Sequence, residues 1–137
     1  TASVTLNQQG SYSLQTSNTC GLFTEQFNII EKICSPEINI PNVITCNNDQ
    51  VNDIFSIQVK QVKKLDFYII NRWGQNITSG QVDNIPMNST SWVDIPLWNG
   101  TSEKGLEVLD GVYFYKIDLQ SSSGDWITKH GFITVFN

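Results

Sequence analysis

The side chains most capable of chemistry gather in one short segment, PNVITCNNDQVNDIF, at residues 41–55. Asn47, Asp49 and Asp53 offer oxygen atoms close together, and a hard cation such as calcium prefers oxygen ligands. The segment has no glutamate where an EF-hand loop needs its last ligand, and Gln50 stands where such a loop needs a ligand or a glycine. Asn and Asp also cap their own backbone in tight turns. We favour this capping interpretation and expect no cofactor, with calcium at these three residues as the alternative.

Catalytic chemistry has little support in the sequence. Hydrolysis would need a nucleophile beside a base, or two opposed carboxylates. The only histidine is His130, which lies within an expected strand and has no candidate partner near it in the sequence. Asp94, Glu103 and Glu107 lie in expected loops, which leaves a pair of carboxylates open as an alternative. We predict that the protein is not an enzyme.

Aromatic side chains offer another kind of site. A flat platform that stacks on sugar rings could be built from Trp73, Trp92, Trp98, Trp126, Tyr113 and Tyr115. The competing interpretation is that these aromatic rings fill the core and the cross-strand pairs of a β-sandwich. We favour the core interpretation. A carbohydrate-binding or calcium-stabilised module of a surface adhesin is the alternative function.

Composition narrows the choice of partner. The chain has 137 residues, of which 15% are charged, and its net charge is -5. Such a chain forms one domain, or one and a fraction, and we take it for part of a larger protein. The acidic balance argues against binding nucleic acid, which needs basic patches. No apolar run approaches the length of about eighteen residues that marks a membrane-spanning helix, so we expect no direct membrane insertion.

The three cysteines, Cys20, Cys34 and Cys46, include no C-x-x-C pair of the kind that binds zinc. Reduced, buried thiols are one interpretation, because a free cysteine packs as a small apolar residue. A single disulfide is the other interpretation. For that case we favour Cys34–Cys46, because the two residues flank one short extended segment.

The elements that must position these residues are expected to be strands, because no apolar repeat of helical period occurs. In the first third we predict strands at 3–7, 11–17 and 22–30. The Gly10–Tyr12 sequence is either a tyrosine corner, as in immunoglobulin-like sandwiches, or an ordinary strand start. Residues 1–36 are therefore interpreted as the last strands of an upstream immunoglobulin-like repeat plus a linker.

The remainder of the chain alternates apolar and polar residues in short runs between turn signals. Phe55, Ile57 and Val59 are expected to face a core, and residues 64–73, apolar on both faces, are expected to form a central strand. The fold class is all-β: an antiparallel immunoglobulin-like β-sandwich of about seven strands, preceded by strands of a partial second β-sandwich. Its other expected strands are an edge strand within 34–41, an extended apolar segment at 41–45, then 53–59, 75–80, 91–98, and a hairpin of 110–120 with 124–136.

Several segments in residues 39–137 occur in the order typical of one family. They are IPNVITCNNDQVNDIF, LDFYIINRWGQNI, LWNGT, LDGVYFYKIDL and KHGFITVF. Together they resemble the gliding motility-associated C-terminal domain, the type B sorting domain of the type IX secretion system of Bacteroidota. We therefore assign residues 37–137 to such a domain.

The resemblance implies a non-catalytic address that the outer-membrane translocon and an associated outer-membrane partner protein recognise. The parent protein would pass through the periplasm and remain attached to the cell surface, with cargo such as a large gliding adhesin. The exposed parts of the family motifs are our candidates for partner recognition: Arg72, Trp73, Gly74, Asp110, Gly111 and Lys129.

The sequence departs from the family pattern in places. Cys46 replaces a proline, Asn48 and Gln50 replace two glycines, and Asn99 replaces an aspartate. Glycine adopts positive φ without steric cost, whereas asparagine only tolerates it. These changes weaken the case for a metal site shared with the family.

Overall fold

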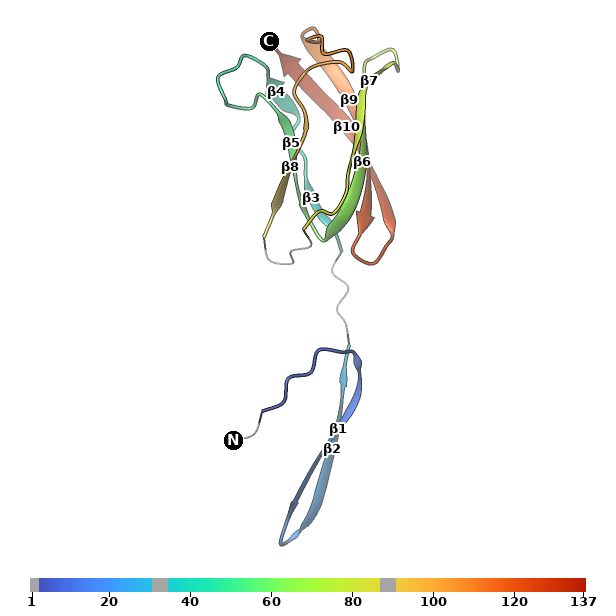
Figure 1. Ribbon diagram of the computed structural model, residues 1–137. Coiled ribbons are helices and arrows are strands. Elements are labelled where there is room, and N and C mark those ends of the chain that lie inside the picture. Colours follow the sequence, from blue (N-terminus) through green and yellow to red (C-terminus); the bar gives the residue numbers. More distant parts are fainter. Residues whose placement is uncertain (1–2, 31–34, 87–90) are drawn as a thin grey trace. The chain divides into compact units, whose positions relative to one another are not determined.

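The computed structural model describes residues 3–30, 35–86 and 91–137, and every regular element in them is a β-strand (Figure 1). The chain divides into two compact units, Thr1–Ile33 and Cys34–Asn137. The assignment of residues 1–36 to an upstream repeat stays a prediction.

The first unit is one antiparallel hairpin, formed by β1 (Gly10–Asn18) and β2 (Gly21–Ile29). Tyr12 lies opposite Phe27, and their rings stack with centroids 6.0 Å apart. The Tyr12 hydroxyl donates a hydrogen bond to the Gln8 carbonyl oxygen at 2.8 Å, which is the backward contact of a tyrosine corner. Residues 3–7 pair with no strand of the described chain, so the predicted strand there is wrong.

The second unit is a β-sandwich of two sheets. One sheet has the order β4-β10-β9-β6-β7, and the other has the order β3-β5-β8. The strands are β3 (Glu37–Asn39), β4 (Val43–Thr45), β5 (Phe55–Lys60), β6 (Val62–Ile70), β7 (Asn76–Val82), β8 (Val93–Trp98), β9 (Gly111–Ser121) and β10 (Trp126–Phe136).

One core lies between the two sheets, because alternate residues of each strand point inward. Phe55, Ile57 and Val59 are 0% exposed, as predicted. Burying a side chain of this kind stabilises a fold by about 1.5–3 kcal/mol. Phe55 of the small sheet meets Tyr115 of the large sheet with ring centroids 5.7 Å apart, which ties the layers together.

The structure confirms the all-β sandwich and the β9–β10 hairpin, whose register runs without a break from Trp126 to Val135. Two details differ from expectation. The described part of this unit has eight strands, and β4 runs parallel to β10. β6 lies between β9 and β7, which confirms the expected central strand, and Tyr68 on its outer face is 43% exposed because the second sheet covers only the other face.

Candidate functional site

The Asn/Asp loop is held by hydrogen bonds from its own backbone. Asp53 accepts from the amides of Asn48 at 2.9 Å and Gln50 at 2.7 Å. Asp49 accepts from the Val51 amide at 2.8 Å and, through its other oxygen, from the Asn47 side chain at 3.0 Å. The carboxylates therefore act as caps in this structure.

A calcium ion would have to compete with these amides for the same oxygens. Within the described ranges, no three His, Cys, Asp or Glu side chains are placed to hold a metal. Calcium at Asn47, Asp49 and Asp53 stays a prediction. The two residues that replace the family's glycines adopt a left-handed backbone conformation: φ is 61° at Asn48 and 68° at Gln50.

Replacing Gln50 by glycine is expected to raise the free energy of unfolding by about 0.5–1 kcal/mol. Left-handed backbone costs an ordinary residue about 1–2 kcal/mol, and the greater freedom of glycine in the unfolded chain offsets part of that gain. Urea unfolding followed by tryptophan fluorescence measures the change, since all four tryptophans lie in the second unit. Val51→Gly is the control, because Val51 lacks positive φ and should lose stability. A Gln50→Gly chain less stable than the parent would contradict the inference that the backbone is strained at Gln50.

Cys46 is a free thiol whose Sγ lies 3.7 Å from the Asn99 carbonyl oxygen and donates to it. Burial raises the pKa of the thiol, and the charges of Asp53 and Glu107 raise it further. The predicted partner, Cys34, lies outside the described residues. The Cys34–Cys46 bridge therefore stays a prediction.

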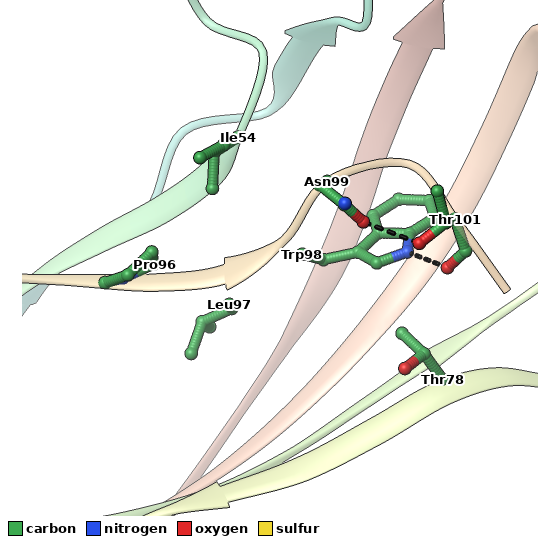
Figure 2. A pocket seen from close by; sticks show the side chains of 7 residues that line it. All are labelled: Ile54, Thr78, Pro96, Leu97, Trp98, Asn99 and Thr101. Atoms are coloured by element: carbon green, nitrogen blue, oxygen red, sulfur yellow. Dashed lines mark hydrogen bonds between the residues drawn. The ribbon is translucent and has the colours of Figure 1, made fainter. Parts of the chain in front are cut away.

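The tryptophan turn that follows β8 closes one side of the sandwich. Trp98 is 4% exposed, and its indole nitrogen donates to the Thr101 carbonyl oxygen at 2.6 Å. The Thr101 hydroxyl donates to the Asn99 side chain at 2.6 Å, so the turn folds over the indole (Figure 2). A pocket of about 280 Å³ beside it is lined by Ile54, Thr78, Pro96, Leu97, Trp98, Asn99 and Thr101.

The six candidate aromatics do not form one platform. Trp98 and Tyr113 are buried and pack edge to face at 5.4 Å, and Tyr115 packs on the core. The exposed tryptophans each have a cation over the ring: Arg72 over Trp73 at 4.5 Å, Lys60 over Trp92 at 4.5 Å and Lys64 over Trp126 at 5.9 Å. Trp73 follows the end of β6, whereas Lys64 lies near its start.

The residues suggested for catalysis stay apart in structural roles. Asp94 lies in β8 rather than in a loop and accepts a hydrogen bond from the Gln58 side chain at 2.9 Å. Glu103 accepts from the Asn76 side chain at 3.0 Å. His130 is exposed in β10, opposite Lys116 of β9.

Four of the candidate recognition residues line one pocket of about 370 Å³. It is formed by Asn71, Arg72, Trp73, Leu109, Asp110, Gly111, Val112, Tyr113 and Phe114. The pairing of β6 with β9 brings its two walls together, because Ile70 lies opposite Phe114. We call this the turn pocket.

The first wall of the turn pocket is a tight turn organised by Asn71. Its side-chain oxygen accepts from the amides of Trp73 at 3.0 Å and Gln75 at 2.9 Å. Gly74 donates to the Asn71 carbonyl oxygen at 2.9 Å and has φ of +78°, a backbone conformation that favours glycine. Gly74 therefore shapes the turn, while Arg72 and Trp73 project from it as exposed side chains.

The second wall is anchored from two directions. Asp110 accepts from the backbone and side-chain nitrogens of Asn137, each at 2.9 Å. The Tyr113 hydroxyl donates to the Leu109 carbonyl oxygen at 2.9 Å. This is a second tyrosine corner, and our sequence reasoning missed it. The signal was present, since Gly111–Tyr113 repeats the Gly-x-Tyr pattern of residues 10–12.

Charges of both signs surround the turn pocket. Burial raises the pKa of Tyr113; the charge of Arg72 acts to lower that pKa, and the charge of Asp110 acts to raise it. Both charged groups are thus close enough to act on the same hydroxyl. Arg72 forms no ion pair with any residue that the structure describes. The site can offer a cation, an anion and aromatic walls to a protein partner.

Lys129 does not belong to this site. It lies opposite Ile117 in the β9–β10 ladder, whereas Gly111 lies opposite Val135. Six residues of strand separate the two positions, which is about 20 Å at the usual rise. Lys129 therefore lies apart from the other five candidates, and its role in partner recognition stays a prediction.

The second unit is a small β-sandwich module with a pocket lined by charged and aromatic residues. The CHU_C type IX secretion signal domain model matches residues 38–135, and the chain belongs to that family. The chain therefore carries a signal that the type IX secretion machinery recognises, for export across the outer membrane to the cell surface. Domains of this kind are generally non-catalytic. No helix in the described ranges is long and apolar enough to cross a membrane.

Two solved structures match the chain at low identity. The crystal structure of dimeric latent PorU from Porphyromonas gingivalis has a TM-score of 0.50 and 15% identity, with 97% of this chain and 13% of that chain covered. CopC from Methylosinus trichosporium OB3b has a TM-score of 0.42 and 14% identity, with 73% of this chain and 89% of that chain covered. A search among curated proteins found no match.

Proposed function

We propose that residues 37–137 are a non-catalytic address that the type IX translocon and an associated outer-membrane partner protein read at the turn pocket. The observation that supports this best is the meeting of two family motifs, through residues 71–73 and 109–114, at one surface. The cargo would be a large surface protein, such as a gliding adhesin, that passes through the periplasm and stays attached outside.

The turn pocket has the composition of a protein-binding site. Arginine and tryptophan are among the residues that most often dominate binding energy at interfaces. Trp73 is 76% exposed, and Leu109 is 82% exposed. Large apolar side chains this exposed on a structured turn are suited to burial against a partner.

The shape of the site is also largely set before binding. Asn71 and Gly74 hold one wall, and Tyr113 and Asn137 hold the other. A surface organised in advance loses little conformational entropy on binding. Arg72 would favour a carboxylate on the partner, because no described residue neutralises it.

An export assay tests this proposal. A signal peptide and a fluorescent reporter are fused to the full chain and expressed in a Bacteroidota host with a type IX system. We expect Arg72→Glu combined with Trp73→Ala to lower the surface signal at least about tenfold, as loss of a hot spot would. The melting temperature of the purified variant should change little, because both side chains are exposed.

Trp92→Ala with Lys60→Ala is the matched control, since that pair has the same 4.5 Å cation–ring distance away from the pocket. The control should export normally. If the reporter reached the cell surface in a strain without the translocon, that result would contradict the address function itself. Normal export of the pocket variant alone would contradict only the assignment of the surface.

A further inference from the structure

Strand β10 has a long open edge. On one side it pairs with β9 from Trp126 to Val135, but on the other it pairs with β4 only from Thr134 to Phe136. Figure 1 shows the short β4 near the C-terminal end of β10. Residues 126–133 therefore have a single neighbouring strand within the described part of the chain.

The hydrogen-bonding groups on this edge can be assigned from the pairs at its closed end. The Thr134 amide donates to the Asn42 carbonyl oxygen at 2.8 Å, and the Phe136 carbonyl oxygen accepts from Cys46 at 2.7 Å. Even-numbered residues of β10 thus point their backbone groups toward β4. Since the register is unbroken, the N–H and C=O groups of Thr128, His130 and Phe132 point the same way, where the described chain offers no partner.

β4 cannot extend to cover this edge. Pro41 has no amide hydrogen, and the segment before it, β3, pairs with β5 in the other sheet. Exposed backbone groups in a row are a template for another strand, which proteins normally cover or guard. The edge here is flanked by exposed aromatic side chains on the outer face, Trp126 and Phe132.

Lys129 lies in the middle of this edge, and its charge limits which strands can bind there. Its side chain belongs to the inward-facing set with Ile127 and Ile133, yet it is exposed. It forms no ion pair with any described residue. An inward-pointing lysine disfavours an apolar strand at an edge, because the ammonium group would be buried without a counter-charge. A strand with a carboxylate opposite Lys129 removes that cost.

We propose that Thr128–Phe132 of β10 is a strand-addition site, which binds an extended segment of a partner protein that carries an acidic residue opposite Lys129. Backbone hydrogen bonds hold the segment, and apolar residues on its outer face pack beside Trp126 and Phe132. This site lies apart from the turn pocket and does not depend on it.

A second copy of this chain fits the edge less well. Residues 126–136 contain no Asp or Glu, so β10 of another copy brings no counter-charge. Antiparallel self-pairing centred on His130 would place Lys129 against Gly131 of the other copy. The acidic residue must therefore come from a different segment.

The test uses the full chain labelled with ¹⁵N and the peptide acetyl-Ser-Val-Glu-Val-Thr-Val-Ser-amide. Binding should shift the amide signals of Thr128, His130 and Phe132 and slow their hydrogen exchange. His130→Pro should weaken binding at least tenfold. This proline removes only an outward N–H, so the β9 ladder stays intact. His130→Ala, which keeps the N–H, should bind within twofold of the parent.

Two further probes keep the test independent of folding defects. The same peptide with N-methyl groups on alternate residues should fail to bind the parent chain. Lys129→Glu should reject the glutamate peptide and accept one with lysine in its place. Shifts that map elsewhere, or equal binding of the methylated peptide, would overturn the proposal. Self-association of the free chain that His130→Pro abolishes would overturn it in favour of a second copy.

Discussion

Replacing Trp98 by alanine is expected to lower the free energy of unfolding by about 3–5 kcal/mol, the usual loss when a large aromatic is removed from a core. The indole is 4% exposed and packs edge to face on Tyr113 at 5.4 Å. Its nitrogen also donates to the Thr101 carbonyl oxygen, which would be left without this donor. A domain with a total stability of about 5–15 kcal/mol would lose much of its margin.

Urea unfolding monitored by the remaining tryptophans measures this loss. Trp92→Ala is the control, because that side chain is 40% exposed and should change the free energy of unfolding by less than about 1 kcal/mol. Trp98→Phe should fall between the two, since it keeps the ring but not the indole N–H. A Trp98→Ala chain as stable as the Trp92→Ala chain would show that the turn does not close the core.

This result bears on the sugar-platform hypothesis as well. Trp98 and Tyr113 are unable to stack on a ligand while they pack on each other inside the sandwich. Any binding lost in Trp98→Ala would report unfolding rather than a missing contact. Trp73, which stands on the exposed turn of the pocket, is the informative position for a binding assay.

Local patterns in the sequence predicted the strands well. Alternation placed Phe55, Ile57 and Val59 in the core, and the turn before Trp126 placed the β9–β10 hairpin. The pattern could not show that β6 is covered on one face only. That outcome depends on how many strands the opposing sheet has, which is a property of the topology. The extended start of the 41–55 segment is β4, as expected, but its parallel pairing with β10 is a long-range contact that no local pattern shows.

The candidate recognition residues also show that local sequence patterns do not reveal long-range strand pairing. Motif resemblance selected Arg72, Trp73, Asp110 and Gly111 individually, but their convergence depends on the pairing of β6 with β9. No local signal carries that long-range register. Lys129 was selected by the same resemblance, and the register places it on the β10 edge instead.

Replacing Gly100 by alanine is expected to lower the free energy of unfolding by about 2–5 kcal/mol. Gly100 has φ of +77°, and left-handed backbone costs alanine about 1–2 kcal/mol. An added Cβ would also overlap the Cys46 Sγ, and overpacking of this kind costs about 1–3 kcal/mol.

The chain offers a control that separates the two costs. Gly105 has φ of +75°, but a Cβ there would meet nothing within 4 Å. Gly105→Ala should therefore show the backbone cost alone, and its difference from Gly100→Ala measures the collision with Cys46. Combining Gly100→Ala with Cys46→Ala should cost less than the sum of the single changes, by about 1–3 kcal/mol. If the losses of the two single variants simply add, the whole loss in Gly100→Ala comes from the backbone conformation at residue 100. A positive coupling would show that the loop after β4 and the tryptophan turn pack as one unit, with Cys46 as the contact between them.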